Sequence, residues 1–181
     1  EVLVDDRTTL AVNAVILGNG GRLGRILDAE MKDRWGPLSY LRSAGEVAFE
    51  LEPLVVEVRL DGEPPRRREI LNLVVANGLY AGGGIPIAPG SDPSDGRLEV
   101  ATVLPAPLPR LLGLLPTLLR HELPEADIYR QEAASTIAVR SESGPVPLSV
   151  DGEVDEARVV EVTILPHRLR VRVPSARSQR G

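Results

Sequence analysis

Residues 72–100, NLVVANGLYAGGGIPIAPGSDPSDGRLEV, decide how the rest of this sequence is interpreted. The stretch opens with a short apolar run, passes through Asn77-Gly78 and three consecutive glycines, and returns to an apolar segment at Leu98. Short runs rich in Val and Leu that are bounded by Gly, Asn or Asp predict β-strands. The intervening loop, Ile87–Gly96, is rich in Pro, Gly and Asp, which predicts turns.

The same strand pattern recurs along the chain, so we predict a mostly β protein. Two stretches favour short helices instead: the apolar positions between Leu38 and Leu51 that follow Pro37, and Leu108–Arg120, which Pro109 and Pro116 should shorten or kink. We expect one domain over residues 1–174 and a disordered tail over 175–181. The predicted strands are Val2–Val4, Leu10–Leu17, Leu54–Leu60, Ile70–Ala76, Leu98–Leu104, Ile128–Val139, Val146–Val150, Arg158–Leu165 and Leu169–Val173.

The composition excludes several classes of protein. Hydrophobic residues make up 43% of the 181-residue chain and charged residues 26%, which is typical of a globular domain. Aromatic residues make up only 3%, and the net charge is −5, so base stacking and attraction to nucleic acid are not expected. The absence of cysteine excludes disulfides and thiolate metal sites and fits a reducing cytoplasm.

The triplet Asp-Gly-Glu occurs twice, at Asp61–Glu63 and at Asp151–Glu153. Asp-Gly between two strand-like runs predicts a tight β-hairpin turn. A turn is therefore the simplest interpretation of each copy, and any functional role must distinguish the two.

Other polar features carry weaker signals. The glycine run Gly82–Gly84 is followed by Ile85-Pro86, with neither the lysine nor the helix of a phosphate-binding loop. His121 and His167 are too few for a His-rich metal site, and Arg66–Arg68 are expected to solvate a hairpin edge. We therefore predict that this chain alone does not bind ATP.

Taken in order, these segments resemble the bacterial diacylglycerol kinase catalytic family, whose relatives include sphingosine kinases. The resemblance rests on residues 72–100, on RWGPLSYL at 34–41, on VNAVILGNGGRLG at 12–24 and on PVPLSVDGE at 145–153. It covers nearly the whole chain but only the carboxy-terminal domain of the family. The Gly-Gly-Asp-Gly-Thr motif of the family's nucleotide-binding domain does not occur in this sequence.

The resemblance implies a β-sandwich-like domain that faces an amino-terminal nucleotide-binding domain across a cleft. It implies that Glu153 accepts the proton of a lipid hydroxyl, with Asp151 beside it, and that ATP is the co-substrate. It also implies a structural Mg²⁺ bound by the loop that contains Ile87, Gly90 and Asp92, although Gly90 stands where some members have a carboxylate. The expected partners are a lipid substrate, the nucleotide-binding domain and, peripherally, the inner face of the membrane, with no nucleic acid.

Two other interpretations remain open. The chain could be a β-sandwich that binds a lipid or a carbohydrate without chemistry, or a regulatory remnant that assembles with a partner chain. The loop Ile87–Gly96, considered alone, is more often an ordinary turn than a cation site. The resemblance favours the acceptor-side domain of a lipid kinase over both alternatives.

Overall fold

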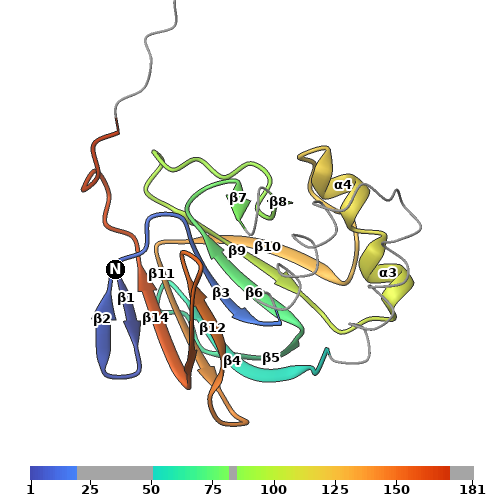
Figure 1. Ribbon diagram of the computed structural model, residues 1–181, viewed down its shortest axis with the longest axis horizontal. Helices are drawn as coiled ribbons and strands as arrows, with labels where there is room; N and C mark the ends of the chain where they lie inside the picture. Colours follow the sequence, from blue (N-terminus) through green and yellow to red (C-terminus); the bar gives the residue numbers. More distant parts are fainter. Residues whose placement is uncertain (20–50, 82–84, 172–181) are drawn as a thin grey trace, which may run out of the picture.

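Two antiparallel sheets of six strands each pack face to face in the computed structural model, which describes residues 1–19, 51–81 and 85–171 (Figure 1). The first sheet has the order β2 (Arg7–Thr9), β1 (Val2–Val4), β14 (Val159–Thr163), β11 (Thr136–Ser141), β4 (Leu54–Leu60) and β5 (Arg66–Ile70). The second sheet has the order β10 (Tyr129–Ala134), β9 (Leu98–Val103), β6 (Asn72–Ala76), β3 (Ala14–Gly18), β12 (Val146–Val150) and β13 (Glu153–Ala157). A small pair, β7 (Tyr80–Ala81) and β8 (Ile85–Pro86), lies apart from both sheets. The predicted mostly β, sandwich-like fold is confirmed.

The core between the sheets is built almost entirely from Val, Leu and Ile. Leu17, Leu73 and Ile137 are among its largest fully buried side chains. Strand β6 is buried on both faces, because Leu73 and Val75 point into the sandwich while Val74 and Ala76 belong to a second apolar cluster outside it. This explains why its sequence is a continuous apolar run and not an alternation.

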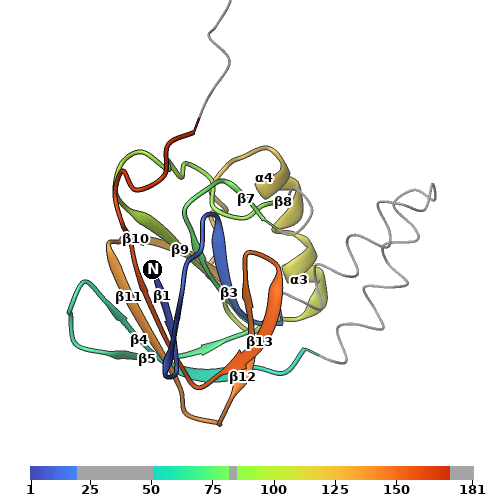
Figure 2. The ribbon, with the colours of Figure 1, turned by 60° about the vertical axis from the view of Figure 1, so that its left-hand side comes forward.

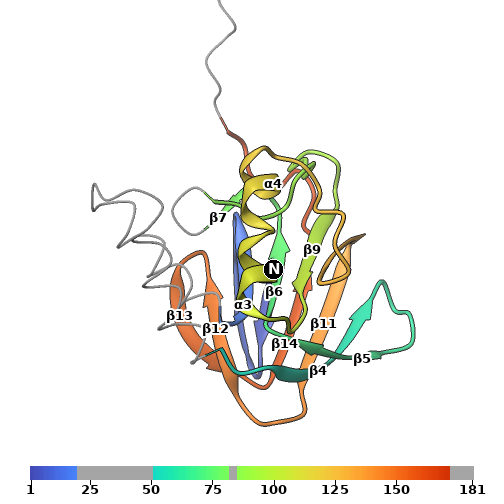
Figure 3. The ribbon, with the colours of Figure 1, turned by 90° about the vertical axis from the view of Figure 1, so that its right-hand side faces the viewer.

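Two short helices cover the outer face of the second sheet. Helices α3 (Leu108–Leu112) and α4 (Leu115–Leu119) bury Leu114 and Leu118 in a cluster with Val74 and Ala101 of the sheet (Figure 3). Each helix has a proline in its first turn, where the missing N–H costs no hydrogen bond. The predicted short, interrupted helix over Leu108–Arg120 is confirmed. The helix predicted after Pro37 lies largely outside the described residues. Residues 34–41 and the predicted tail 175–181 lie entirely outside them. None of the helices in the described ranges is long and apolar enough to cross a bilayer.

The predicted strands differ from the observed ones where the chain changes sheet. The segment predicted as one strand over Ile128–Val139 is two strands, because the chain leaves the second sheet after Ala134 and joins the first at Thr136. The prediction over Leu10–Leu17 starts too early, since Leu10–Asn13 form the passage from β2 to β3. The predicted strand Leu169–Val173 is absent from its described part, where Leu169 and Val171 are exposed and pair with neither sheet.

The predicted strand ranges leave out β2, β13, the two-residue strands β7 and β8, and all of β5 except Ile70, although Arg66–Arg68 are expected at a hairpin edge. Three of these strands are sheet edges that bury little apolar surface. Strands β2 and β5 are the two edges of the first sheet, and β13 is an edge of the second. Their side chains are mostly exposed, and those of β5 and β13 are mostly charged. Charged edge strands of this kind discourage pairing with other chains, but they lack the alternation that identifies a strand in sequence.

A positive-φ aspartate anchors three of the hairpin turns to places where the chain changes sheet. Asp5, Asp61 and Asp151 have φ values of 49°, 47° and 48°. The carboxylate of Asp5 accepts hydrogen bonds from the N–H groups of Arg158 and Val159 between β13 and β14, and the carboxylate of Asp61 accepts them from Ser135 and Thr136 between β10 and β11. Such bonds satisfy amides that the bend removes from both sheets.

Ion pairs join the two sheets at both open sides of the sandwich. Arg68 of β5 donates two hydrogen bonds to Glu132 of β10, at 2.5 and 3.0 Å, and its side chain is only 8% exposed. Arg7 of β2 pairs with Asp155 of β13 on the other side at 2.5 Å. Arg66 and Arg67 are exposed as expected for a solvated edge, whereas Arg68 turns inward to meet Glu132.

We predict that Glu132 contributes stability that is lost in acid. Hydrogen bonds from Arg68 lower the pKa of Glu132 below its ordinary value of 4.5, so its contribution is complete above that pH and disappears as the pH falls through the lowered pKa. Glu132→Gln should therefore reduce the free energy of unfolding at neutral pH and flatten its acid dependence. Urea denaturation between about pH 3 and pH 7 measures both effects. The exposed Glu125→Gln is the control, and an equal acid dependence in all three proteins would contradict the prediction.

Candidate functional site

Four segments meet at one end of the second sheet. The register pairs Ala14 with Ala76 and Val15 with Val150, so the start of β3 lies beside the ends of β6 and β12. Ala76 also pairs with Glu99, which brings the loop before β9 to the same end. The segments are the turn 151–153, residues 12–13, residues 77–80 and the loop 87–97.

The carboxylate of Asp151 fixes the turn that carries Glu153. It accepts hydrogen bonds from the backbone N–H groups of Val12 at 2.6 Å, Asn13 at 3.0 Å and Ala14 at 2.8 Å. The Asp151 N–H donates in return to the Ala14 carbonyl at 2.9 Å. Asp151 is thus engaged by the main chain of the passage from β2 to β3, as Asp5 and Asp61 are engaged at theirs.

The Glu153 side chain is exposed at the first position of β13. Within the described residues its carboxylate forms neither a hydrogen bond nor an ion pair. In the other Asp-Gly-Glu turn, Glu63 is also exposed but pairs with Arg66 at 2.8 Å. Figure 2 shows the two hairpins, β4–β5 and β12–β13, on opposite sides of the sandwich. The two turns therefore differ in both place and pairing, and of the two glutamates only Glu153 lacks an ion pair within the described residues.

Two asparagines connect this turn to the residues that precede the glycine run. The Asn77 side-chain amide donates to the Val12 carbonyl at 2.9 Å, and the Asn13 amide donates to the Tyr80 carbonyl at 2.8 Å. The Asn77 Oδ1 is buried and has no hydrogen-bond donor among the described residues. The Tyr80 hydroxyl lies 3.1 Å from Nε2 of His121, with the two rings edge to face.

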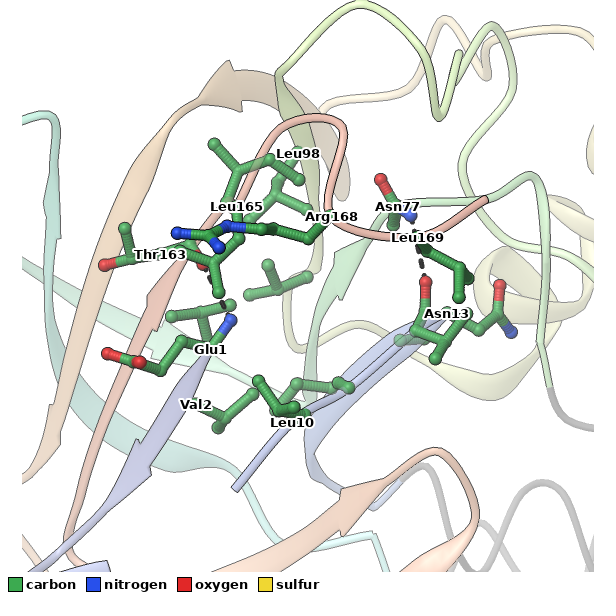
Figure 4. A pocket seen from close by; sticks show the side chains of 17 residues that line it. Glu1, Val2, Leu10, Asn13, Asn77, Leu98, Thr163, Leu165, Arg168 and Leu169 are labelled. Atoms are coloured by element: carbon green, nitrogen blue, oxygen red, sulfur yellow. Dashed lines mark hydrogen bonds between the residues drawn. The ribbon is translucent and has the colours of Figure 1, made fainter. Parts of the chain in front are cut away.

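A cavity of about 240 Å³ opens between the two sheets at this end. Figure 4 shows Leu10, Leu98, Leu165 and Leu169 around it, together with the Arg168 side chain. Its mouth is unusually apolar, since Leu10 is 68% exposed and Leu169 is 62% exposed. Val12, Asn13 and Ala14, whose amides bind Asp151, form part of its wall. No local signal in the sequence identifies this cavity, because its lining comes from segments at both ends and in the middle of the chain.

The loop suggested for a metal ion is held in place by two side chains of β10. The Ile87 carbonyl accepts a hydrogen bond from the Tyr129 hydroxyl at 3.2 Å, and the Pro89 carbonyl accepts one from Gln131 at 2.9 Å. Gly90 has a φ of +84°, a left-handed conformation that glycine adopts without strain.

Asp92 and Asp95 are the exposed carboxylates of this loop, and Asp92 is the one among the predicted donors. Its Oδ1 accepts hydrogen bonds from the N–H and the hydroxyl of Ser94, at 2.8 and 2.6 Å, which lower the pKa of Asp92. The described ranges contain no group of three His, Cys, Asp or Glu side chains that could hold a metal ion. The predicted donors Ile87, Gly90 and Asp92 thus lie in one ordered loop, with a single ionised carboxylate among them.

Comparison with known proteins defines the class of this domain. A family model described as the YegS C-terminal NAD kinase beta sandwich-like domain matches residues 6–173. The chain belongs to this family, and the resemblance to the carboxy-terminal domain of bacterial diacylglycerol kinases is confirmed.

Similar curated proteins share the name "Probable lipid kinase YegS-like". One from Pseudomonas fluorescens is 32% identical over 106 residues, which cover 59% of this chain and 34% of that protein. One from Xanthomonas oryzae is 28% identical over 157 residues, or 82% of this chain and 48% of that protein. The chain therefore spans about half the length of the curated relatives it matches, or less. A diacylglycerol kinase structure from Bacillus anthracis has the same fold, with a TM-score of 0.57 and 16% identity over 92% of this chain and 50% of that one.

We predict that the Asp151 carboxylate stabilises the packing of the turn 151–153 against residues 12–14. Asparagine tolerates a positive φ, so Asp151→Asn changes the acceptor without forcing the turn to open. It should lower the free energy of unfolding by about 1 kcal/mol, because one of the charged acceptor oxygens becomes a donor. Thermal unfolding measures the loss. Asp61 accepts both of its hydrogen bonds on Oδ1, which the amide oxygen of asparagine can replace, whereas Asp151 uses both of its oxygens. Asp61→Asn should therefore shift the midpoint less, and the reverse order would contradict this assignment.

Proposed function

We propose that this chain is the acceptor-side domain of an ATP-dependent lipid kinase that phosphorylates a hydroxyl of diacylglycerol or a similar lipid. The names of its relatives support a lipid kinase, and their greater length supports a second domain that binds the nucleotide. A lipid acceptor resides in a membrane, so we also propose that the two-domain protein acts peripherally at the cytoplasmic face.

One observation carries the proposal: an exposed carboxylate without a partner among the described residues stands on a turn that is anchored to residues 12–14, which line an apolar cavity. Asp151 holds the turn to Val12–Ala14, which form a wall of the cavity. An apolar cavity with an apolar mouth suits the hydrocarbon part of a lipid, and a free carboxylate suits its hydroxyl.

The reaction assigns a single task to Glu153. The lipid hydroxyl oxygen attacks the γ-phosphorus of ATP, the bond to the bridging oxygen breaks, and ADP leaves. Glu153 orients the hydroxyl and accepts its proton. Phosphoryl transfer requires little covalent assistance from the protein, so positioning of the acceptor and of this base is the main contribution of the domain.

The loop 87–97 fits a hydrated Mg²⁺ in its donor chemistry. All of its candidate donors are oxygen atoms, and the Ser94 hydrogen bonds that lower the pKa of Asp92 keep that carboxylate ionised at neutral pH. We propose that Asp92, with the carbonyls of Ile87 and Gly90, would hold the ion, which when bound would neutralise charge and stiffen the loop. The Ile87 carbonyl already accepts one hydrogen bond, so water must supply most of the coordination.

The alternative function is a binding module that holds a lipid without chemistry. The apolar cavity supports this alternative as well, because it requires no base. The two functions differ in what Glu153 does, so a substitution at that position separates them.

In the two-domain protein, Glu153→Gln should lower the rate of lipid phosphorylation by about 10²- to 10⁴-fold, the usual effect of losing a general base. Glu63→Gln is the matched control from the twin turn and should change stability by less than about 0.5 kcal/mol and leave turnover unchanged. Transfer of labelled phosphate from ATP to diacylglycerol is measured at equal thermal stability. Equal activity of the two variants, or a larger loss at Glu63, would refute the role of Glu153.

For the metal loop, we predict weak binding of Mg²⁺ that depends on Asp92. Titration of the chain with Mg²⁺ should shift the amide resonances of Asp92 and Ser94, and Asp92→Asn should abolish these shifts. The exposed turn residue Asp6 provides the control, since Asp6→Asn should leave the titration unchanged. If saturating Mg²⁺ leaves the loop resonances in place, the loop is a plain turn.

A further inference from the structure

Asn13 occupies a junction between the turn of Glu153 and the segment that leads into the glycine run. Its backbone N–H donates to Asp151, and its carbonyl accepts a hydrogen bond from the Asn77 N–H at 2.8 Å. Its side-chain amide donates to the Tyr80 carbonyl at 2.8 Å. One residue therefore contacts the turn of Glu153 through its main chain and residues 77–80 through both its main chain and its side chain.

Gly78 leaves the space that this junction needs. A Cβ atom placed on Gly78 would lie 2.8 Å from Oδ1 of Asn13, a separation that real Cβ atoms essentially never show. The φ of Gly78 is not in the left-handed region, so its backbone conformation does not require glycine. A Cβ at this position would instead displace the Asn13 side chain from its hydrogen bond to Tyr80, which links residue 78 to the placement of Asn13.

Asn77 fastens the same junction from the other side. Its side-chain amide donates to the Val12 carbonyl, so residues 12 and 13 are both bonded to residue 77. The same two residues donate their amides to Asp151. The path from Tyr80 through Asn13 to Asp151 consists of two consecutive hydrogen bonds and ends two residues from Glu153.

We propose that Asn13 is a positioning residue that fixes the segment at Tyr80 relative to the Glu153 turn. The inference rests on the proposed function, since it assigns Asn13 a role through Glu153. A base must lie within hydrogen-bond reach of the proton it accepts, and small misplacements of reacting groups cost large factors in rate. Loss of the Asn13 side chain should therefore affect the chemical step more than the binding of either substrate.

The chain offers a matched control at the other end of the same strand. Asn19 follows β3 as Asn13 precedes it, and the Asn19 amide donates to the carbonyls of Leu71 and Glu52 at 2.9 and 3.1 Å. Both asparagines thus tie β3 to neighbouring loops, but only Asn13 lies at the end that carries Glu153. A purely structural role predicts the same behaviour for both.

The test is steady-state lipid phosphorylation by the two-domain protein. Asn13→Ala should lower kcat by about 10- to 100-fold while the KM values for ATP and lipid change less than about threefold. Asn19→Ala should lower thermal stability and leave kcat unchanged at temperatures where it is folded. Gly78→Ala should also lower kcat, and Asn13→Ala combined with Gly78→Ala should be no worse than Asn13→Ala alone, because the clash needs the Asn13 side chain.

Several outcomes would overturn the inference. They are an unchanged kcat in Asn13→Ala, an equal loss in Asn19→Ala, or additive losses in the Asn13 and Gly78 pair. The failure of the proposed function is distinguishable, because Glu153→Gln would then retain full activity. If Glu153→Gln loses activity and folded Asn13→Ala does not, only the positioning role of Asn13 is wrong.

Discussion

The constraint on which this fold depends is the need to satisfy backbone amides where the chain passes from one sheet to the other. At these bends the N–H groups leave both hydrogen-bond ladders, and an unsatisfied amide in a packed domain costs free energy comparable to a lost hydrogen bond. Three aspartates in hairpin turns meet this need. Asp5 serves the passage at Arg158–Val159, Asp61 the passage at Ser135–Thr136 and Asp151 the passage at Val12–Ala14. Each of these aspartates also adopts the positive φ that its turn requires. The same residue therefore forms the turn with its backbone and binds the neighbouring passage with its carboxylate.

This arrangement gives the two Asp-Gly-Glu turns the same construction but different surroundings. The turn at Asp61 ends in Glu63, which is paired with Arg66 on a charged edge strand. The turn at Asp151 ends in Glu153, whose carboxylate has no partner within the described part of the chain, and its anchor is a wall of the apolar cavity. The aspartate of the triplet is thus explained by folding, and Glu153 is the residue to which we assign the proposed role of general base. A turn fastened by charged hydrogen bonds is a rigid support, which would suit that proposed role because proton transfer depends on the distance between the base and the hydroxyl.

The open sides of the sandwich show how a small core is closed without aromatic side chains. The central strands bury Val, Leu and Ile, but the outermost strands β2, β5 and β13 expose polar residues. Ion pairs cross between the sheets at these edges, Arg68 with Glu132 on one side and Arg7 with Asp155 on the other. The ion pair of Arg68 with Glu132 is bidentate and partly buried. It is the stronger of the two, since exposed pairs such as Arg7 with Asp155 contribute little.

The sequence by itself determined the central strands, the Asp-Gly hairpins and the proline-interrupted helix, because each depends on residues close together in the chain. Val2–Val4, Leu54–Leu60 and Val146–Val150 match their predicted bounds for this reason. Family resemblance added Glu153 and the loop of Asp92 as candidate site residues. Only the tertiary structure decided where strands change sheet, which edge strands form, that Arg68 turns inward, and that Asp151 binds residues 12–14 more than 130 positions away. Hydrogen bonds and cavities of this kind join distant segments, so their partners are fixed by how the two sheets pack and not by any local pattern of residues.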